Sequence, residues 1–247
     1  MIELSIIIPV FNEQKKISRD ILAADHFLDS KGLTGEIIVV DDGSTDDTAK
    51  IAQQTAETTH SECIVEPLKQ NRGKGCAVRT GILKSRGRFV AFADSGCCVP
   101  YEEVQLGIDL IASEQCRIAH GSRKIDSCHI LQSQQLYRRI CSKFFHWFLI
   151  HDIKRLGNLT DTQCGFKIYD GPTAHRLYAE SIIDGFMFDV EITLLALSNG
   201  YNICEFPVNW TCDRDSRLKP IHETIRVLTD LIRLKRRFRS YLKQNRQ

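Results

Sequence analysis

Acidic side chains follow two apolar stretches of the sequence, at the points where each stretch ends. The stretch FVAFADSGCCVP (89–100) stops abruptly at Asp94, before a turn that contains glycine and ends in proline. The stretch VVDDGSTDDT (39–48) contains Asp41 and Asp42, followed by hydroxyl-bearing residues. Carboxylates at such positions can accept hydrogen bonds from ribose hydroxyls or a base N–H group, or bind a divalent cation. The other interpretation of the second stretch is an acidic turn whose side chains cap a helix.

A basic, glycine-containing loop provides the opposite charge. The segment QNRGKGCAVRTG (70–81) combines glycines, the start of a predicted helix, and the side chains of Arg72 and Lys74. Glycine allows close backbone approach, and a helix N-terminus with cationic side chains attracts phosphate. A Gly-Lys-Gly loop alone is weak evidence, because many loops contain one. Together with acidic groups on two strand ends, it indicates a site for a nucleoside diphosphate, with or without a metal.

Strands alternate with helices over the first hundred residues. LSIIIPV (4–10) is a continuous β-branched run, of the kind buried on both faces of a parallel sheet. Further strands are expected at 36–40, 63–67 and 88–94, with one helix opened by Asn12 and Glu13, one capped by Ser44 or Thr45, and one at 74–86. This alternation predicts an α/β fold with a doubly wound sheet, whose ligands bind beyond the carboxyl ends of the strands. The segments 9–13, 41–46 and 68–76 should therefore share one edge of the sheet with Asp94.

The second half of the chain is less regular. We expect a strand and turn at RIAHGSR (117–123), a long helix rich in aromatic and basic residues at 134–156, and a polar loop at 158–169. Helices at 172–182 and 188–199, a strand at 203–210 and a terminal helix from about residue 221 complete the pattern.

Composition limits the classes of protein that fit. The 247 residues are 43% hydrophobic and 26% charged, as in an ordinary soluble globular protein, and the net charge of +2 is too small to indicate a general polyanion partner. The ten cysteines are scattered and the N-terminus lacks the basic start of a signal peptide, so we expect reduced thiols in an intracellular protein. Because no apolar stretch reaches the roughly 18 residues that a spanning helix needs, an integral membrane protein is not expected.

Six segments are informative as an ordered set. They are VFNE (10–13) after Pro9, VVDDGSTDDT (39–48), NRGKGCAVRTG (71–81), the strand ending at Asp94, GSR (121–123) and DTQCGFK (161–167). In this order they resemble the motifs of family 2 inverting glycosyltransferases with the GT-A fold, and the resemblance covers nearly the whole chain. FDVE (188–191) and PVNW…DSRLK (207–219) resemble dolichyl-phosphate glucosyltransferases most, with dolichyl-phosphate mannose synthases a step further away.

The resemblance implies a fold and its division. A GT-A domain, a Rossmann-like and mostly parallel sheet flanked by helices, would occupy residues 1–220. Its nucleotide-sugar-binding half would be 1–100 and its acceptor-binding half 101–220. Residues 221–247 would form an amphipathic, basic C-terminal helix.

The resemblance also implies which residues bind the donor. Pro9, Phe11, Glu13 and Asp42 would hold the uracil or guanine base and the ribose, with Phe11 in place of a more usual tyrosine. Two cationic side chains would lie near the nucleotide or its diphosphate, namely those of Lys74 and Arg123. Glu13 has an alternative role as an acid in the first turn of a helix.

Three further residues would shape the sugar and acceptor site. Asp161 and Lys167 would line it, and Arg217 would stand near the acceptor phosphate, where the family often has lysine. The alternatives are that Asp161 caps a turn and that Lys167 and Arg217 are solvated surface charges. With Asp94, these three are the candidate catalytic residues.

The metal-binding motif of the family is incomplete here. Its D-x-D places two carboxylates around Mg²⁺ or Mn²⁺, whereas this chain has Asp94, Ser95 and Gly96. Because a hard divalent ion needs only one or two protein carboxylates and takes the rest from water and substrate phosphates, we expect Asp94 to hold the ion with reduced affinity. Two other interpretations stay open. Cationic side chains could neutralise the diphosphate without a metal (Arg72, Lys74, Arg123 or Arg214), or catalysis has been lost.

The reaction implied is inverting transfer of a hexose, first of all glucose from UDP-glucose, to a polyprenyl phosphate such as dolichyl or undecaprenyl phosphate. A phosphate monoester with a second pKa of about 6 is largely ionised near neutral pH and can attack without a general base. The alternatives are a soluble transferase with a sugar or protein hydroxyl acceptor, for which Asp161 or Asp189 would be the base, and a non-catalytic nucleotide-sugar-binding protein.

Two basic segments favour a membrane surface as a partner. The segment 136–156 combines apolar aromatics with flanking cations, which suits a helix at the bilayer interface. The tail from Arg226 onward is also basic, and anionic headgroups could hold it. We therefore expect a cytoplasmic enzyme, peripheral on the cytoplasmic face of a membrane and without a nucleic acid partner. The alternative for both segments is a helix packed on the protein with a solvated face.

Overall fold

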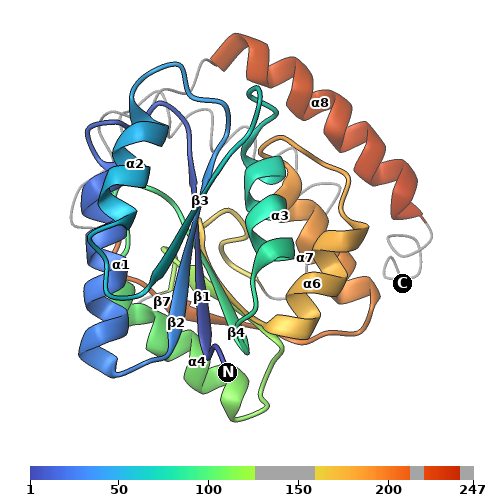
Figure 1. The fold of residues 1–247 in the computed structure, drawn as a ribbon. Coiled ribbons are helices and arrows are strands. Elements are labelled where there is room, and N and C mark those ends of the chain that lie inside the picture. Colours follow the sequence, from blue (N-terminus) through green and yellow to red (C-terminus); the bar gives the residue numbers. More distant parts are fainter. Residues whose placement is uncertain (126–158, 212–219, 240–247) are drawn as a thin grey trace.

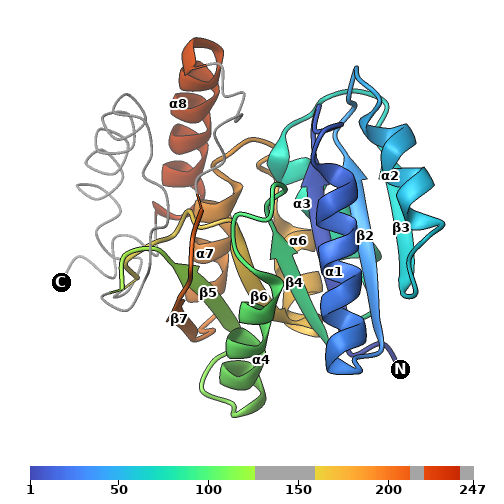
Figure 2. The ribbon, with the colours of Figure 1, turned by 90° about the vertical axis from the view of Figure 1, so that its left-hand side faces the viewer.

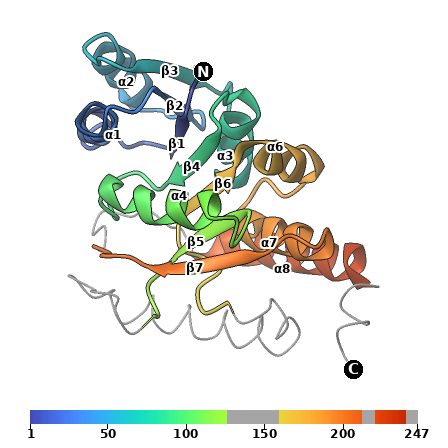
Figure 3. The same ribbon diagram turned by 90° about the horizontal axis from the view of Figure 1, so that it is seen from below.

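One sheet runs through the part of the chain that the computed structural model describes, residues 1–125, 159–211 and 220–239. The sheet is the central layer in Figure 1, and its strands lie in the order β3-β2-β1-β4-β6-β5-β7, as labelled in Figure 3. Their bounds are β1 (Leu4–Val10), β2 (Gly35–Asp41), β3 (Glu62–Pro67), β4 (Phe89–Ala93), β5 (Ile118–Ser122), β6 (Phe166–Asp170) and β7 (Ile203–Pro207). Neighbouring strands are parallel except where β6 pairs antiparallel with β4 and with β5. The predicted α/β fold with a mostly parallel sheet is confirmed.

Helices cover both faces of this sheet, as Figures 2 and 3 show. On one face lie α1 (Ile17–Lys31), α2 (Thr48–Ala56) and, after the short helix η1 (Tyr101–Glu103), α4 (Val104–Ala112). On the other lie α3 (Lys74–Lys84), α6 (Gly171–Glu180), α7 (Phe188–Ser198) and α8 (Pro220–Arg237). In β1, Ile6 and Ile8 join the first core and Ile7 the second, because successive side chains of a strand point to opposite faces. This explains the unbroken apolar run in the sequence.

Three local predictions differ from the structure. The first helix begins at Ile17 rather than at Asn12, because Asn12 has a left-handed backbone (φ 56°) that a helix cannot contain. The next begins at Thr48, whose backbone N–H donates to the Asp46 side chain, so Ser44 and Thr45 do not cap it. The predicted polar loop at 158–169 contains most of β6.

The terminal helix α8 is part of the second core. Leu231, Leu234 and Phe238 are buried in the same hydrophobic cluster as residues of α3, α6 and α7. Within the described ranges, no helix combines the length and the apolar character needed to cross a bilayer. The predicted helix at 134–156, Arg214, Arg217 and the end of the tail beyond 239 lie outside the described residues.

Candidate functional site

The carboxyl ends of the parallel strands bring the predicted acidic and basic groups together. Asp94 follows β4 directly, and its backbone N–H donates to the carbonyl of Gly165, just before β6, at 2.8 Å. One carboxylate oxygen of Asp94 lies 2.6 Å from the Lys74 ammonium. A Cβ atom at position 165 would overlap the Asp94 carboxylate, so the glycine of the DTQCGFK motif makes room for this acid. Asp94, Lys74 and the 161–167 motif therefore form one site.

The turn after Asp94 is held by the first helix. Gly96 and Cys97 both have left-handed backbones, with φ of 94° and 47°. The buried carboxylate of Asp20 accepts from the Gly96 N–H at 2.7 Å, and Arg19 donates to the Gly96 carbonyl at 2.9 Å. Burial raises the pKa of Asp20, and the hydrogen bonds that it accepts from the Cys97 thiol and the Gly96 N–H oppose the rise. Sequence reasoning missed Asp20, although an acid between Ile17 and Ile21 on the apolar face of α1 is a signal for such a role.

Lys74 is enclosed as well as ion-paired. It is the first residue of α3, its side chain is 21% exposed, and its ammonium lies 5.2 Å from the ring centroid of Phe92 and 6.0 Å from that of Phe188. Burial alone would lower the pKa of Lys74, but the carboxylates of Asp94 and Asp189 raise it above its ordinary value. Lys74 is therefore a cation under any ordinary condition.

The basic loop differs from a phosphate cradle made of backbone amides. The amides of Arg72 and Gly73 donate to the two carboxylate oxygens of Asp42, at 2.9 and 2.8 Å. A Cβ at Gly73 would come 2.5 Å from the Asp184 carbonyl oxygen, so this glycine permits close packing on the 183–185 segment. The Arg72 guanidinium pairs with the Asp184 carboxylate at 2.9 Å. Asp42 thus fixes the loop and occupies the backbone amides of Arg72 and Gly73.

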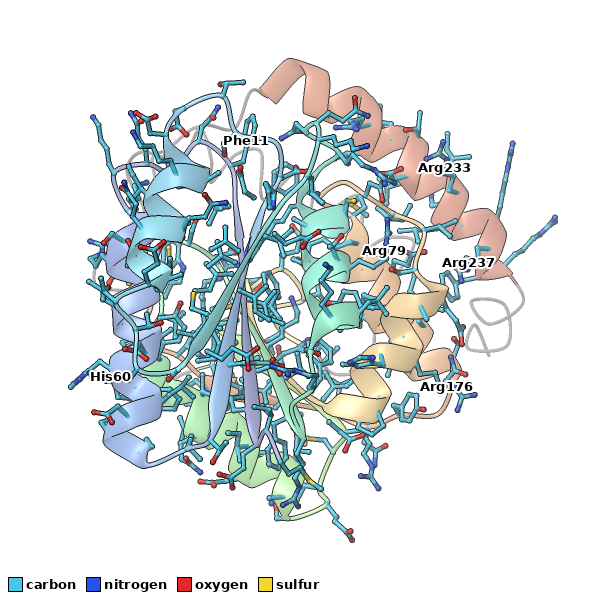
Figure 4. All side chains as sticks on the ribbon, in the orientation of Figure 1. Phe11, His60, Arg79, Arg176, Arg233 and Arg237 are labelled. Carbon is cyan, nitrogen blue, oxygen red and sulfur yellow. The ribbon has the colours of Figure 1, made fainter. Side chains whose placement is uncertain are left out.

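Two loops beside this one are joined by Asn12. Its backbone N–H donates to the Ser44 hydroxyl at 2.8 Å, and its side-chain oxygen accepts from the Thr45 N–H at the same distance. The preceding residue, Phe11, is 40% exposed. It lies beyond the carboxyl end of β1 (Figure 4). The Glu13 carboxylate lies 3.2 Å from the Lys16 ammonium. Of the residues predicted to hold the nucleotide, Phe11 is thus open to a base, whereas Pro9 is buried within β1.

A second acid of the site, Asp161, is held by an arginine. The Arg123 guanidinium donates to both carboxylate oxygens of Asp161, at 2.6 and 2.9 Å, and stacks 5.4 Å from the Trp210 ring centroid. Burial opposes ionisation of Asp161, but the hydrogen bonds and charge of Arg123 lower its pKa to about 2. Asp161 is therefore a permanently ionised anchor for Arg123 and a weak base.

Lys167 lies inside the protein rather than at its surface. Its side chain is 1% exposed, and its ammonium lies 2.5 Å from an Asp189 carboxylate oxygen and 2.8 Å from the Cys164 carbonyl. Burial raises the pKa of Asp189, and the charges of Lys167 and Lys74 oppose this. The alternative of a solvated surface charge is therefore excluded for Lys167. Its ammonium instead links the 161–167 motif to Asp189 of α7.

A buried histidine adjoins this pair. His120 of β5 is fully buried, and within the described residues neither ring nitrogen has a hydrogen-bond partner. Burial, together with the nearby charge of Lys167, lowers the pKa of His120 well below its ordinary value. The imidazole is therefore neutral, and the sequence offered no pattern that would have singled it out.

A small pocket opens beside Asp94. Its walls include Cys98, Cys164, Gly165 and Trp210, so it lies between the turn after β4, the 161–167 motif and the strand end of β7. Within the described residues, no group of three histidine, cysteine or acidic side chains forms a metal cluster. Among the described residues, the donor set at Asp94 is one carboxylate, which suits a hard divalent ion only when diphosphate oxygens and water complete its coordination.

A mostly parallel sheet whose strand ends carry an exposed aromatic ring, a basic loop and the carboxylate of Asp94 is the arrangement expected of a nucleotide-sugar-dependent glycosyltransferase. The family model of glycosyl transferase family 2 matches residues 5–174, and this chain belongs to that family. Dolichyl-phosphate beta-glucosyltransferase of Dictyostelium discoideum is 35% identical over 248 residues, which cover 96% of this chain and 75% of that protein. The enzyme of the same name from Homo sapiens is 31% identical over 250 residues, covering 96% and 76%.

Solved structures resemble the fold at lower identity. Glucosyl-3-phosphoglycerate synthase from Mycobacterium tuberculosis in complex with Mn²⁺, UDP and phosphoglyceric acid matches with a TM-score of 0.69 at 18% identity. The complex of the same enzyme with Mn²⁺ and UDP-glucose matches with a TM-score of 0.69 at 17% identity, and each covers 94% of this chain and 78% of the other. The expected GT-A fold is confirmed.

Proposed function

We propose that this glycosyltransferase transfers glucose from UDP-glucose to a polyprenyl phosphate of the dolichyl type, with inversion, at a membrane surface. The curated relatives named above, at 31–35% identity over nearly the whole chain, support this choice of donor sugar and acceptor. In this proposal residues 1–100 bind the donor and residues 101–220 the acceptor, with 221–247 as a basic terminal segment.

One observation carries the choice of a phosphate acceptor. Asp161 is ion-paired with Arg123 and its pKa is lowered to about 2, while Asp189 is buried beneath Lys167. Neither acid is arranged to take a proton from a hydroxyl, which is what a sugar or protein acceptor would require. A lipid phosphate monoester is already ionised near neutral pH and needs only to be oriented. Arg123, beside Asp94 and the pocket, is the described side chain best suited to hold it.

The donor would lie along the strand ends. Phe11 offers its exposed ring to the uracil, and Arg72 and Lys74 offer cationic side chains to the diphosphate. We propose that Mg²⁺ or Mn²⁺, held by Asp94 and the donor, neutralises negative charge on the departing diphosphate. The hexose would then lie beside Asp94, at the mouth of the small pocket that Trp210 also lines.

A membrane surface is proposed for α8. Leu228 and Ile232 are 46% and 52% exposed, and basic residues share the helix with them, Arg233 among them (Figure 4). Exposed apolar side chains beside cations favour the interface of an anionic membrane. The enzyme would then act as a peripheral protein on the cytoplasmic face.

The test is a transfer assay with radiolabelled donors. The purified chain is incubated with UDP-glucose or GDP-mannose and a short polyprenyl phosphate, with Mg²⁺, Mn²⁺ or EDTA, and then extracted with organic solvent. We expect label in the organic phase with UDP-glucose, dependence on the lipid phosphate and a β-linked product by NMR. A water-soluble product would instead favour a hydroxyl acceptor, and donor binding without transfer would favour a non-catalytic protein.

A further inference from the structure

Among the residues that the structure describes, the charges next to Asp94 balance one another. Asp94 pairs with Lys74 at 2.6 Å, and Asp189 pairs with Lys167 at 2.5 Å. The two pairs adjoin the same ring, since the Phe92 centroid lies 5.2 Å from the Lys74 ammonium and 5.9 Å from the Lys167 ammonium. Two acids and two bases thus form a neutral set, in which a cation already contacts the carboxylate that is expected to bind a metal.

Lys74 is held at this position from several sides. Its ammonium lies against the rings of Phe92 and Phe188, which contact each other edge to face. Its backbone is fixed because a Cβ at the following residue, Gly75, would come 2.5 Å from the Ile183 carbonyl oxygen. The first residue of a helix is also an unfavourable place for a cation, since the N-terminal end carries partial positive charge. Carboxylate partners are therefore what keep the ammonium here.

We propose that Lys74 is the resident cation of Asp94, and that a divalent ion binds this carboxylate only in exchange with the Lys74 ammonium. The inference rests on the proposed function, because it concerns the metal that would assist the donor. Adding two positive charges to a neutral set of side chains is unfavourable in a partly buried site unless a cation leaves or an anion arrives. The donor diphosphate supplies that anion and gives the displaced ammonium a new partner. Metal and diphosphate therefore bind together, and metal alone binds weakly.

The test measures Mn²⁺ binding without nucleotide, by the EPR signal of free Mn²⁺ during titration of the full chain. We expect Lys74→Met to bind Mn²⁺ at least about tenfold more tightly than the wild type, because the competing cation is gone. Lys84→Met is the matched control, since Lys84 is on the same helix but pairs with Glu66. It should bind as the wild type does. Lys74→Gln serves as a second variant if Lys74→Met fails to fold.

A double variant tests whether the tighter Mn²⁺ binding of Lys74→Met depends on the Asp94 carboxylate. Adding Asp94→Asn to Lys74→Met should remove the gain, because the released carboxylate is then absent. The inference is overturned if Lys74→Met and the wild type bind Mn²⁺ equally, or if the double variant keeps the gain.

A third measurement examines the link to the donor. UDP should increase the Mn²⁺ affinity of the wild type by a larger factor than that of Lys74→Met, in which no ammonium has to be displaced. Equal factors would contradict the exchange. None of these titrations needs an acceptor or turnover. The exchange can therefore be found even if glucose is not transferred to a lipid phosphate, and transfer can be found even if the exchange is not.

Discussion

At Asp94, a substitution should affect the proposed transfer reaction strongly and the stability of the fold only slightly. Its side chain is 35% exposed at a strand end, and ion pairs exposed to this degree contribute about 1 kcal/mol or less to stability. We expect Asp94→Asn to lower kcat for transfer at least about 100-fold, because charge stabilisation at the leaving group is lost. The free energy of unfolding, measured with urea, should fall by no more than about 1 kcal/mol. Asp29→Asn, at an exposed position of α1, is the control, and wild-type turnover in the Asp94 variant would contradict the role.

Gly96 leads to a prediction about restoring the missing acid. Its φ of 94° lies where residues with a side chain are strained by about 1–2 kcal/mol. We expect Gly96→Asp to lower the free energy of unfolding by about that amount without raising transfer activity, since the added carboxylate distorts the turn held by Asp20. Ser95→Asp adds the same charge outside the left-handed backbone region and should change stability less. A Gly96→Asp variant as stable as the wild type and more active would show that the turn adapts.

Which residues of the site were predictable follows from how they are brought together. Asp94, Asp42 and the basic loop were expected at one edge because parallel strands end at the same side of a sheet. Asp20 and Asp184 were not expected, since their hydrogen-bond partners lie 76 and 112 positions away and no periodicity connects them. The family motifs identified the site, and the groups that hold it rigid became visible only in the structure.

Strand β6 is the element that sequence patterns described least well. The motif before it is polar, and Lys167 stands inside the strand, so the segment is typical of a loop. The lysine is tolerated because Asp189 of α7 meets its ammonium at 2.5 Å in the core. An ion pair between a strand and a helix that is distant in the sequence cannot be inferred from alternation of apolar and polar residues.

His120, on the neighbouring strand β5, should make folding sensitive to acid. Its register partners are Lys167 on β6 and Glu205 on β7, and Asp161 lies nearby. The folded state holds its pKa well below the ordinary 6.5, so the unfolded state binds the proton first as the pH falls. The contribution of this group to stability is therefore complete above about pH 6.5, and below it stability falls by up to about 1.4 kcal/mol per pH unit.

Replacing this histidine tests the effect. In His120→Leu, urea unfolding between about pH 7 and pH 5 should show a loss of stability smaller by about 2 kcal/mol than in the wild type. His26→Gln, at an exposed position of α1, is the control for the loss of a histidine. An unchanged pH dependence of stability in His120→Leu would mean that the imidazole binds a proton as readily in the folded state as in the unfolded state, which would contradict the prediction.

At the scale of the whole molecule, a hydrophobic core on each face of the sheet stabilises the fold, and the candidate site lies at the carboxyl ends of the parallel strands. The alternation of strands and helices was sufficient to predict the doubly wound sheet, because buried parallel strands have unbroken apolar runs. The packing of α8 could not be derived in this way, since its sequence is amphipathic and basic whether it lies on protein or on lipid. In the structure Arg237 pairs with Glu191 of α7 at 2.5 Å, and Arg226 donates to the Arg72 carbonyl of the basic loop at 3.3 Å. The terminal helix therefore contacts both the second core and the loop proposed to bind diphosphate.

Substitutions on the two faces of α8 should accordingly have different effects, one on stability and the other on vesicle binding. Leu234 is 1% exposed in the second core, so Leu234→Ala should lower the free energy of unfolding by about 2–4 kcal/mol. Ile232 is 52% exposed, so Ile232→Ser should change stability by about 0.5 kcal/mol or less while weakening co-sedimentation with vesicles that contain anionic phospholipid. Vesicle binding measured below the unfolding range should be retained in Leu234→Ala, because its outer face is intact. If Ile232→Ser binds vesicles as the wild type does, the exposed face of α8 is only a solvated surface, and membrane contact must come from another part of the chain.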